Sequence, residues 1–162
     1  MARVLIVGCG CRGRELAAEL VARGHAVRGT TRDPAAMALI QAAGAEPAQA
    51  DPDRLATLVP ALDHVAVVVF LLGSATGTTD SVQALHEMRL EALMRAVLDT
   101  TVRGLVYEAA GTLPVSLLDA GAELVARECE RSRIPFAVPR VEPGSGWLAE
   151  LVDAVDRVLS AG

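Results

Sequence analysis

The chain has 162 residues, of which 52% are hydrophobic, 22% charged and 2% aromatic, and its formal net charge at pH 7 is −5. This balance is typical of a folded domain rather than a disordered chain, and the length predicts one domain over residues 1–162. The acidic charge and the scarcity of aromatic residues argue against a nucleic-acid-binding surface. All 15 basic residues are arginine, which excludes chemistry that needs a lysine amine, such as Schiff-base formation.

The cysteines and the apolar segments bear on where the protein resides. Cys9, Cys11 and Cys129 form no CxxC pair, which is typical of a reducing compartment. The longest apolar run, Val65–Leu72, has 8 residues, whereas a membrane-spanning helix needs about 20. The apolar stretch at the N-terminus is too short for a signal peptide. We therefore expect a cytoplasmic protein that makes no contact with a membrane.

Short apolar runs alternate with segments of helical periodicity along the chain. In chain order, the predicted strands are Arg3–Val7, His25–Thr31, Ala45–Gln49, Val65–Leu72, Gly104–Tyr107 and Phe136–Val138. The predicted helices, each following one of these strands, are Arg14–Arg23, Pro34–Ala43, Pro52–Val59, Asp80–Asp99, Leu117–Ser132 and Trp147–Leu159. This alternation predicts a doubly wound α/β fold, in which helices cover both faces of a parallel sheet.

Ligands of such sheets bind at the carboxyl ends of the strands, where the strand order reverses. The sequence Gly8-Cys9-Gly10-Cys11-Arg12-Gly13 lies at the end of the first predicted strand and fits the pattern GxGxxG. Gly8 permits a tight turn, Gly10 lets the backbone approach a diphosphate, and Gly13 lets the helix pack closely on the strand. These positions, together with Cys11 and Arg12, predict a dinucleotide site. The alternative is a glycine-rich turn that binds nothing.

The end of the second strand bears on the choice between NAD and NADP. An acidic residue there would hydrogen-bond the ribose 2′-hydroxyl of NAD. This chain has Thr31 and Arg32 instead, and a guanidinium matches the 2′-phosphate of NADP. Asp33 is the competing acidic candidate, but its position before Pro34 favours a helix cap. We expect NADP as the cofactor, with NAD less favoured; alternatively, Arg32 is only a solvated surface charge.

The loops after the fourth and fifth strands hold further candidates. Gly73 and Ala109 are predicted cofactor contacts. Glu108, at the carboxyl end of the fifth strand, is a weak catalytic candidate, as a base or as a hydrogen-bond partner of the cofactor, with a structural carboxylate as the alternative. Cys9 and Cys11 lie near a helix N-terminus, which can lower a thiol pKa, but we favour small side chains in a tight loop.

The histidines do not indicate a catalytic or metal-binding site. The three histidines, His25, His64 and His86, are scattered along the sequence. We expect each of them on the surface or at a strand edge. No tetrahedral metal-ligand set is apparent.

Two stretches of the sequence carry a resemblance to a known family. GCGCRGRELAAELVARGHAVRGTTRDP and RIPFAVPRVEPG resemble the start and the sixth-strand region of atypical, extended-type short-chain dehydrogenase/reductases, the NAD(P)-dependent epimerase/dehydratase and NmrA-like group. The resemblance implies a three-layer Rossmann domain with strand order 3-2-1-4-5-6. It also implies cofactor contacts at Gly8, Gly10, Gly13 and Arg32.

The catalytic residues of that family do not carry over. Its active members have a Ser or Thr after the fifth strand and a Tyr-x-x-x-Lys motif on the next helix. Val115 and Asp119 fall at the Tyr and Lys positions here. Only about 16 residues follow the sixth-strand loop, too few for the family's substrate lobe.

Three functions remain open. The first is an NADP(H)-binding oxidoreductase whose catalytic residues are non-standard or lost. The second is a non-catalytic NADP(H) redox sensor or scaffold that acts through a protein partner. The third is an empty fold that serves only as an oligomer subunit. The predicted helix Asp80–Asp99 is a candidate homodimer face.

Overall fold

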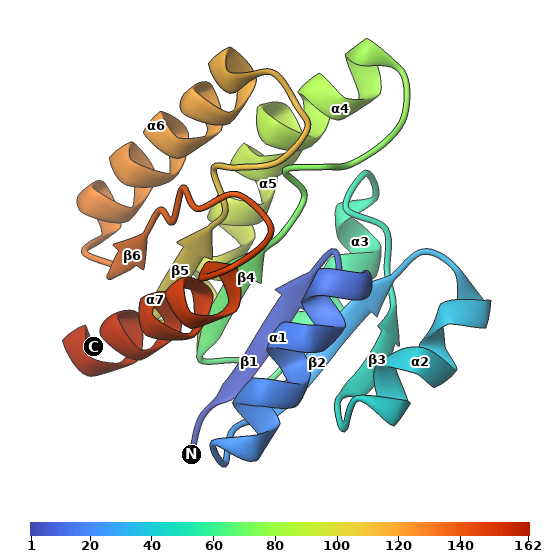
Figure 1. The fold of residues 1–162 in the computed structure, drawn as a ribbon. Coiled ribbons are helices and arrows are strands. Elements are labelled where there is room, and N and C mark those ends of the chain that lie inside the picture. Colours follow the sequence, from blue (N-terminus) through green and yellow to red (C-terminus); the bar gives the residue numbers. More distant parts are fainter.

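A computed structural model describes all 162 residues and contains one six-stranded parallel sheet in the order β3-β2-β1-β4-β5-β6 (Figure 1). The strands are β1 Arg3–Val7, β2 Ala26–Thr31, β3 Glu46–Gln49, β4 Val67–Phe70, β5 Gly104–Tyr107 and β6 Phe136–Ala137. The chain reverses its direction of winding between β1 and β4, which lie side by side with Val4 beside Val67. The predicted doubly wound fold and its strand order are confirmed.

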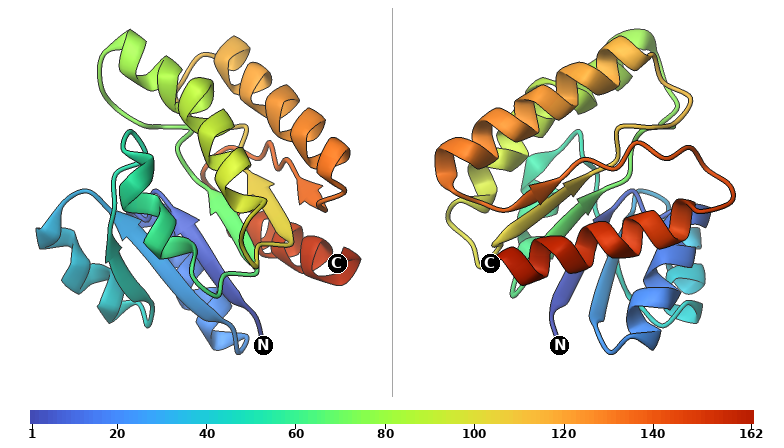
Figure 2. Two further views of the ribbon diagram at one scale, coloured as in Figure 1. Left: turned by 180° about the vertical axis from the view of Figure 1, so that it is seen from behind. Right: turned by 60° about the vertical axis from the view of Figure 1, so that its left-hand side comes forward.

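Helices cover both faces of the sheet, as the turned views show (Figure 2). The α-helices are α1 Cys11–Ala22, α2 Met37–Ala42, α3 Leu55–Leu58, α4 Thr79–His86, α5 Met88–Val97, α6 Val115–Ser132 and α7 Trp147–Ala161, and two 3₁₀ turns span Pro34–Ala36 and Val59–Leu62. Helices α1, α2 and α7 pack on one face, and α3, α5 and α6 pack on the other. None of the helices is both long and apolar enough to cross a lipid bilayer.

The central strand β1 shows why the strands are continuous apolar runs. Val4 and Ile6 belong to the core under α1 and α7, whereas Leu5 and Val7 belong to the core under α3, α5 and α6. Successive side chains of a strand point to opposite faces, so a strand covered on both faces needs apolar residues at every position. All four of these side chains are completely buried.

The predicted helix Asp80–Asp99 is wrong in one respect, because the structure divides it into α4 and α5. The break lies at Glu87, whose backbone has φ −121° and ψ −98°. No glycine or proline marks this position in the sequence. The break follows His86, whose side chain turns into the core and makes two hydrogen bonds there.

Candidate functional site

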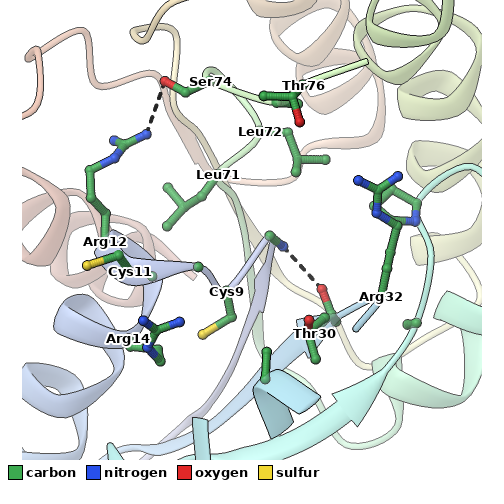
Figure 3. Close-up of a pocket in the computed structure, with 18 of the residues that line it drawn as sticks. Cys9, Cys11, Arg12, Arg14, Thr30, Arg32, Leu71, Leu72, Ser74 and Thr76 are labelled. Carbon is green, nitrogen blue, oxygen red and sulfur yellow. Dashed lines mark hydrogen bonds between the residues drawn. The ribbon is translucent and has the colours of Figure 1, made fainter. Parts of the chain in front are cut away.

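A pocket of about 430 Å³ lies at the carboxyl ends of β1, β2, β3 and β4 (Figure 3). Its volume is within the usual range for small-molecule sites. We call it the glycine-loop pocket. Its 19 lining residues are Gly8–Arg14, Thr30–Arg32, Ala36, Ala50, Pro52, Leu71, Leu72, Ser74–Thr76 and Leu85. Seven predicted contacts meet there: Gly8, Gly10, Cys11, Arg12, Gly13, Thr31 and Arg32.

The three motif glycines occupy three different environments. Gly8 has φ +88°, and a Cβ there would lie 2.7 Å from the carbonyl oxygen of Leu71. A Cβ on Gly13 would lie 3.1 Å from the Gly8 carbonyl oxygen, so α1 packs closely on the loop. A Cβ on Gly10 would meet no atom within 4 Å. Gly10 therefore leaves open space beside the pocket, which a diphosphate needs to reach the main chain.

Backbone N–H groups at the start of α1 are available to an anion. The loop is tied to β2, because Gly8 N–H donates to Thr30 Oγ1 (3.1 Å) and Cys9 N–H donates to the Thr30 carbonyl (3.0 Å). No side chain caps α1, and its first main-chain bond runs from Arg14 N–H to the Gly10 carbonyl (2.9 Å). The preceding N–H groups of the first turn and the partial positive charge of the helix end therefore favour an anion.

The charged side chains of the pocket are all cationic. Arg12, Arg14 and Arg32 line it, and no aspartate or glutamate does, although the whole chain has a net charge of −5. Arg14 and Arg32 make no ion pair or side-chain hydrogen bond, so both guanidinium groups are available to a ligand. Figure 3 shows Arg32 on the opposite side of the pocket from Arg12. The pocket is therefore suited to an anion with separated charges.

The side chains on either side of Arg32, Thr31 and Asp33, accept hydrogen bonds within the turn that follows β2. Thr31 Oγ1 accepts a hydrogen bond from Asp33 N–H (3.1 Å). Asp33 Oδ1 accepts one from Ala35 N–H (2.9 Å) and so caps the 3₁₀ turn, as its position before Pro34 predicts. Asp33 is not among the residues that line the pocket. Arg32, directly after β2, is therefore the charged side chain of this turn that lines the pocket.

Arg12 is held in an ion pair instead of pointing freely into the pocket. Arg12 Nη1 donates to Glu108 Oε2 (2.7 Å), and Trp147 Nε1 donates to the same oxygen (2.6 Å). The Arg12 guanidinium carbon also lies 5.2 Å from the centroid of the Trp147 ring, within cation–π range. Glu108 is completely buried, and its Oε1 has no hydrogen-bond partner. We call these three residues the Arg12–Glu108–Trp147 cluster.

The other predicted site residues lie outside the glycine-loop pocket. Gly73 and Ala109 belong to closely packed loops, and Ala109 N–H donates to the Pro139 carbonyl (3.0 Å). Glu108 does not line the pocket either. Val115 is 70% exposed at the start of α6, and Asp119 pairs with Arg140 (2.7 Å).

The two cysteines of the loop differ in their surroundings. Cys9 is buried, and this burial raises the pKa of its thiol to about 11. A Cβ on the neighbouring Gly29 would lie 2.6 Å from Cys9 Sγ. Cys11 is exposed at the first position of α1. The thiol of Cys9 is therefore protonated at neutral pH and acts as a small packing group rather than a nucleophile.

The expectation that His86 lies on the surface or at a strand edge is wrong. The side chain is completely buried and joins the loop after β4 to β5. His86 Nε2 lies 2.8 Å from the Leu72 carbonyl, which can only accept, so Nε2 carries the proton. Nδ1 then accepts from the Tyr107 hydroxyl (2.6 Å). Burial raises the pKa of Tyr107, so its hydroxyl stays protonated and available as this donor.

A pH dependence of stability follows from this burial. Desolvation lowers the pKa of His86 from its ordinary 6.5, more than the Leu72 hydrogen bond raises it. Below pH 6.5 the unfolded chain therefore takes up a proton that the folded chain does not, and the free energy of unfolding falls. We expect a loss of up to about 1.4 kcal/mol between pH 7.5 and 5.5. Urea denaturation checks this, and an equal loss in a His86→Gln variant would contradict it.

Comparison with known proteins shows the family to which the chain belongs. The fold and the pocket define a nucleotide-binding α/β protein, and the chain belongs to the NAD(P)H-binding family, whose sequence model matches residues 8–122. No curated protein sequence matches the chain. The resemblance to epimerase/dehydratase and atypical short-chain dehydrogenase/reductase proteins is confirmed at the level of the fold.

Three solved structures illustrate the similarity of the fold. A protein from Bacillus halodurans described as a NAD-dependent epimerase/dehydratase has a TM-score of 0.72 and 20% identity over 88% of this chain and 71% of its own. A short-chain dehydrogenase/reductase superfamily protein from Agrobacterium tumefaciens, solved with NAD, has a TM-score of 0.69 and 20% identity. The match covers 84% of this chain and 48% of that protein. A UDP-glucuronic acid 4-epimerase variant from Bacillus cereus, solved with NAD, has a TM-score of 0.66 and 16% identity. The match covers 84% of this chain and 55% of that protein. This chain spans about half the length of the latter two.

The residues that the sequence did not predict for the site and its surroundings include Arg14, Ser74 and Trp147. Arg14 lies in the first turn of α1 directly after the glycine motif, so its position is visible in the sequence. Ser74, which accepts from Arg12 Nη2 (3.4 Å), and Trp147 are far from the motif along the chain. Nothing in the local sequence indicates that Trp147 meets Glu108.

Proposed function

We propose that this protein binds NADP(H) in preference to NAD(H) in the glycine-loop pocket. The observation that carries the proposal is the pair of unpaired guanidinium groups, Arg14 and Arg32, in a pocket without an acidic residue. The N–H groups of the first turn of α1 hold the diphosphate. Arg32, at the carboxyl end of β2, takes the 2′-phosphate, where an NAD-binding domain would offer a carboxylate to the 2′-hydroxyl.

The residues around the pocket fit this cofactor. Gly10 leaves space in which a side chain would obstruct the diphosphate. Leu71, Leu72 and Leu85 supply apolar lining, which is typical of nucleotide pockets. A bound nicotinamide cofactor supplies or accepts a hydride, and the residues named here bind and orient its adenosine diphosphate portion.

We further propose that the protein is a non-catalytic binding protein that acts through a protein partner. Glu108, the weak candidate for a base, is neutralised by Arg12 and accepts a second hydrogen bond from Trp147. Tyr107 is buried and donates to His86. The chain has no lysine to lower the pKa of a tyrosine. Sustained NADPH oxidation by the purified protein with any member of a panel of carbonyl compounds would contradict this proposal and support an oxidoreductase.

Arg32→Ala is expected to weaken NADPH binding about tenfold or more and to leave NADH binding unchanged. A charge-assisted hydrogen bond to phosphate contributes about 1.5–3 kcal/mol, and 1.4 kcal/mol corresponds to a factor of ten in Kd. Isothermal titration calorimetry with both nucleotides measures the change. Arg103→Ala is the matched control, because Arg103 is exposed, makes no ion pair and lies at the amino end of β5, opposite the carboxyl ends of the strands where the pocket lies. Equal weakening of NADPH and NADH binding would refute the assignment of Arg32 to the 2′-phosphate.

A further inference from the structure

The glycine-loop pocket opens over only one half of the sheet. A doubly wound domain has two mononucleotide-binding halves, and a dinucleotide lies across the crevice between them. Here the lining residues come from the loop after β1, the ends of β2 and β3, the loop after β4, and Leu85 of α4. None comes from residues 86–162, which contain β5, β6 and the loops that follow them. The half that would hold the second nucleotide is not part of the pocket.

The loops after β4 and β5 are joined next to the sheet, which removes the space between Gly73–Ser74 and Ala110–Leu113. Leu113 N–H donates to the Gly73 carbonyl (3.1 Å), and Thr112 N–H donates to Ser74 Oγ (3.1 Å). A Cβ at Gly73 would clash with the carbonyl oxygen of Ala110, so the two main chains are in direct contact. No ring can enter between Gly73 and Ala110 unless these two main chains separate.

The Arg12–Glu108–Trp147 cluster closes the crevice at the carboxyl end of β5, next to the joined loops. Arg12 leaves the glycine loop and crosses to the carboxyl end of β5, where Glu108 and Trp147 hold it. Trp147 is only 2% exposed. Moving Arg12 aside would leave the completely buried Glu108 with one hydrogen-bond donor, although one of its oxygens already has none. Burying a less compensated carboxylate is unfavourable, so the closed arrangement is preferred.

We infer that the pocket takes the 2′-phosphorylated adenosine diphosphate portion of the nucleotide and leaves the nicotinamide ring outside, excluded by the Arg12–Glu108–Trp147 cluster and the joined loops. The inference rests on the proposed NADP(H) site and specifies what that site recognises. The protein then binds the oxidised and reduced forms equally. Its occupancy reports the concentration of the nucleotide and not its redox state, so the partner-directed role is that of a scaffold rather than a redox sensor.

The test compares ligands that share the adenosine end. Calorimetry on the full chain gives Kd for NADP⁺, NADPH and 2′-phospho-ADP-ribose, which is NADP⁺ without the nicotinamide ring. We expect the three Kd values to agree within about threefold. A ring that stays outside the pocket contributes less than about 0.7 kcal/mol to the binding free energy, which corresponds to a factor of about three. Saturation-transfer NMR on NADP⁺ is expected to show transfer to the adenine protons and none to the nicotinamide protons.

The possible results separate the inference from the proposed function. Tenfold tighter binding of NADP⁺ or NADPH than of 2′-phospho-ADP-ribose would overturn the inference and leave NADP(H) binding standing. Saturation of the nicotinamide protons to the same extent as the adenine protons would overturn it as well, whatever the affinities. No binding of any of the three ligands would overturn both the inference and the proposed function.

Two arginine variants test the cluster itself. Arg12→Leu removes the group that closes the crevice, and we expect NADP⁺ to bind at least fivefold tighter than 2′-phospho-ADP-ribose in this variant. The ratio is informative because the lost charge affects the phosphates of both ligands alike. Arg14→Leu is the matched control: it weakens the binding of both ligands but leaves the ratio of their Kd values near one. A ratio near one in Arg12→Leu would contradict the role of Arg12 in excluding the ring.

Discussion

Gly10→Val is expected to weaken NADPH binding about 100-fold without changing the fold. The valine side chain would occupy the open space beside the pocket and keep the diphosphate from the N–H groups of α1. Losing two charge-assisted hydrogen bonds of about 1.5 kcal/mol each accounts for this factor. The backbone at Gly10, with φ −81° and ψ −153°, is accessible to valine. Calorimetry measures the affinity, and urea denaturation checks the stability.

A second valine provides the control for this experiment. Ala18 is exposed on the same helix, away from the pocket, so Ala18→Val adds a similar side chain where no ligand lies. This variant is expected to bind NADPH as the unchanged protein does. If Gly10→Val binds NADPH within threefold of the unchanged protein, the glycine loop does not hold the diphosphate, and the proposal that this pocket binds a dinucleotide is wrong.

Gly73→Ala is expected to lower the free energy of unfolding by about 3 kcal/mol, the upper end of the usual cost of overpacking. The added Cβ would clash with the carbonyl oxygen of Ala110, which is main chain and cannot rotate away. It would also lie 3.5 Å from Glu108 Oε1, which already lacks a partner. Urea denaturation measures the loss.

The matched control is Gly10→Ala, which adds the same methyl group at a glycine that has no close neighbours. A Cβ at Gly10 meets nothing within 4 Å, so we expect a change in stability of less than about 1 kcal/mol. Equal stability of the Gly73→Ala and Gly10→Ala variants would show that the loops after β4 and β5 separate easily. That outcome would also weaken the case for exclusion of the nicotinamide ring.

The strands and the glycine loop were predictable because each is encoded by neighbouring residues. The apolar run Arg3–Val7 matches β1 residue for residue, and Gly104–Tyr107 matches β5. The motif at Gly8 and Gly13 specifies a turn and a close helix–strand contact through residues that are adjacent in sequence. The unbroken apolar character of the strands predicted a sheet covered on both faces, and with it the place where a ligand binds.

Other features could not be read from the sequence because they depend on contacts between distant segments. The break at Glu87 follows from the burial of His86 against Tyr107, 21 positions further along the chain. The surroundings of Glu108 depend on Arg12, 96 positions earlier, and on Trp147, 39 positions later. Gly73 looks like an ordinary loop glycine until Ala110 is placed against it.

Local patterning alone was sufficient for the fold class and for the glycine loop at the start of α1, because periodicity and turn chemistry act over a few residues, whereas the strand order came from the family resemblance. Tertiary packing alone decided which cations remain free. It leaves Arg14 and Arg32 without partners and holds Arg12 on Glu108, although all three are arginines near the same crevice. The physical reason is that a completely buried carboxylate must be compensated, and the folded chain brings Arg12 and Trp147 to it.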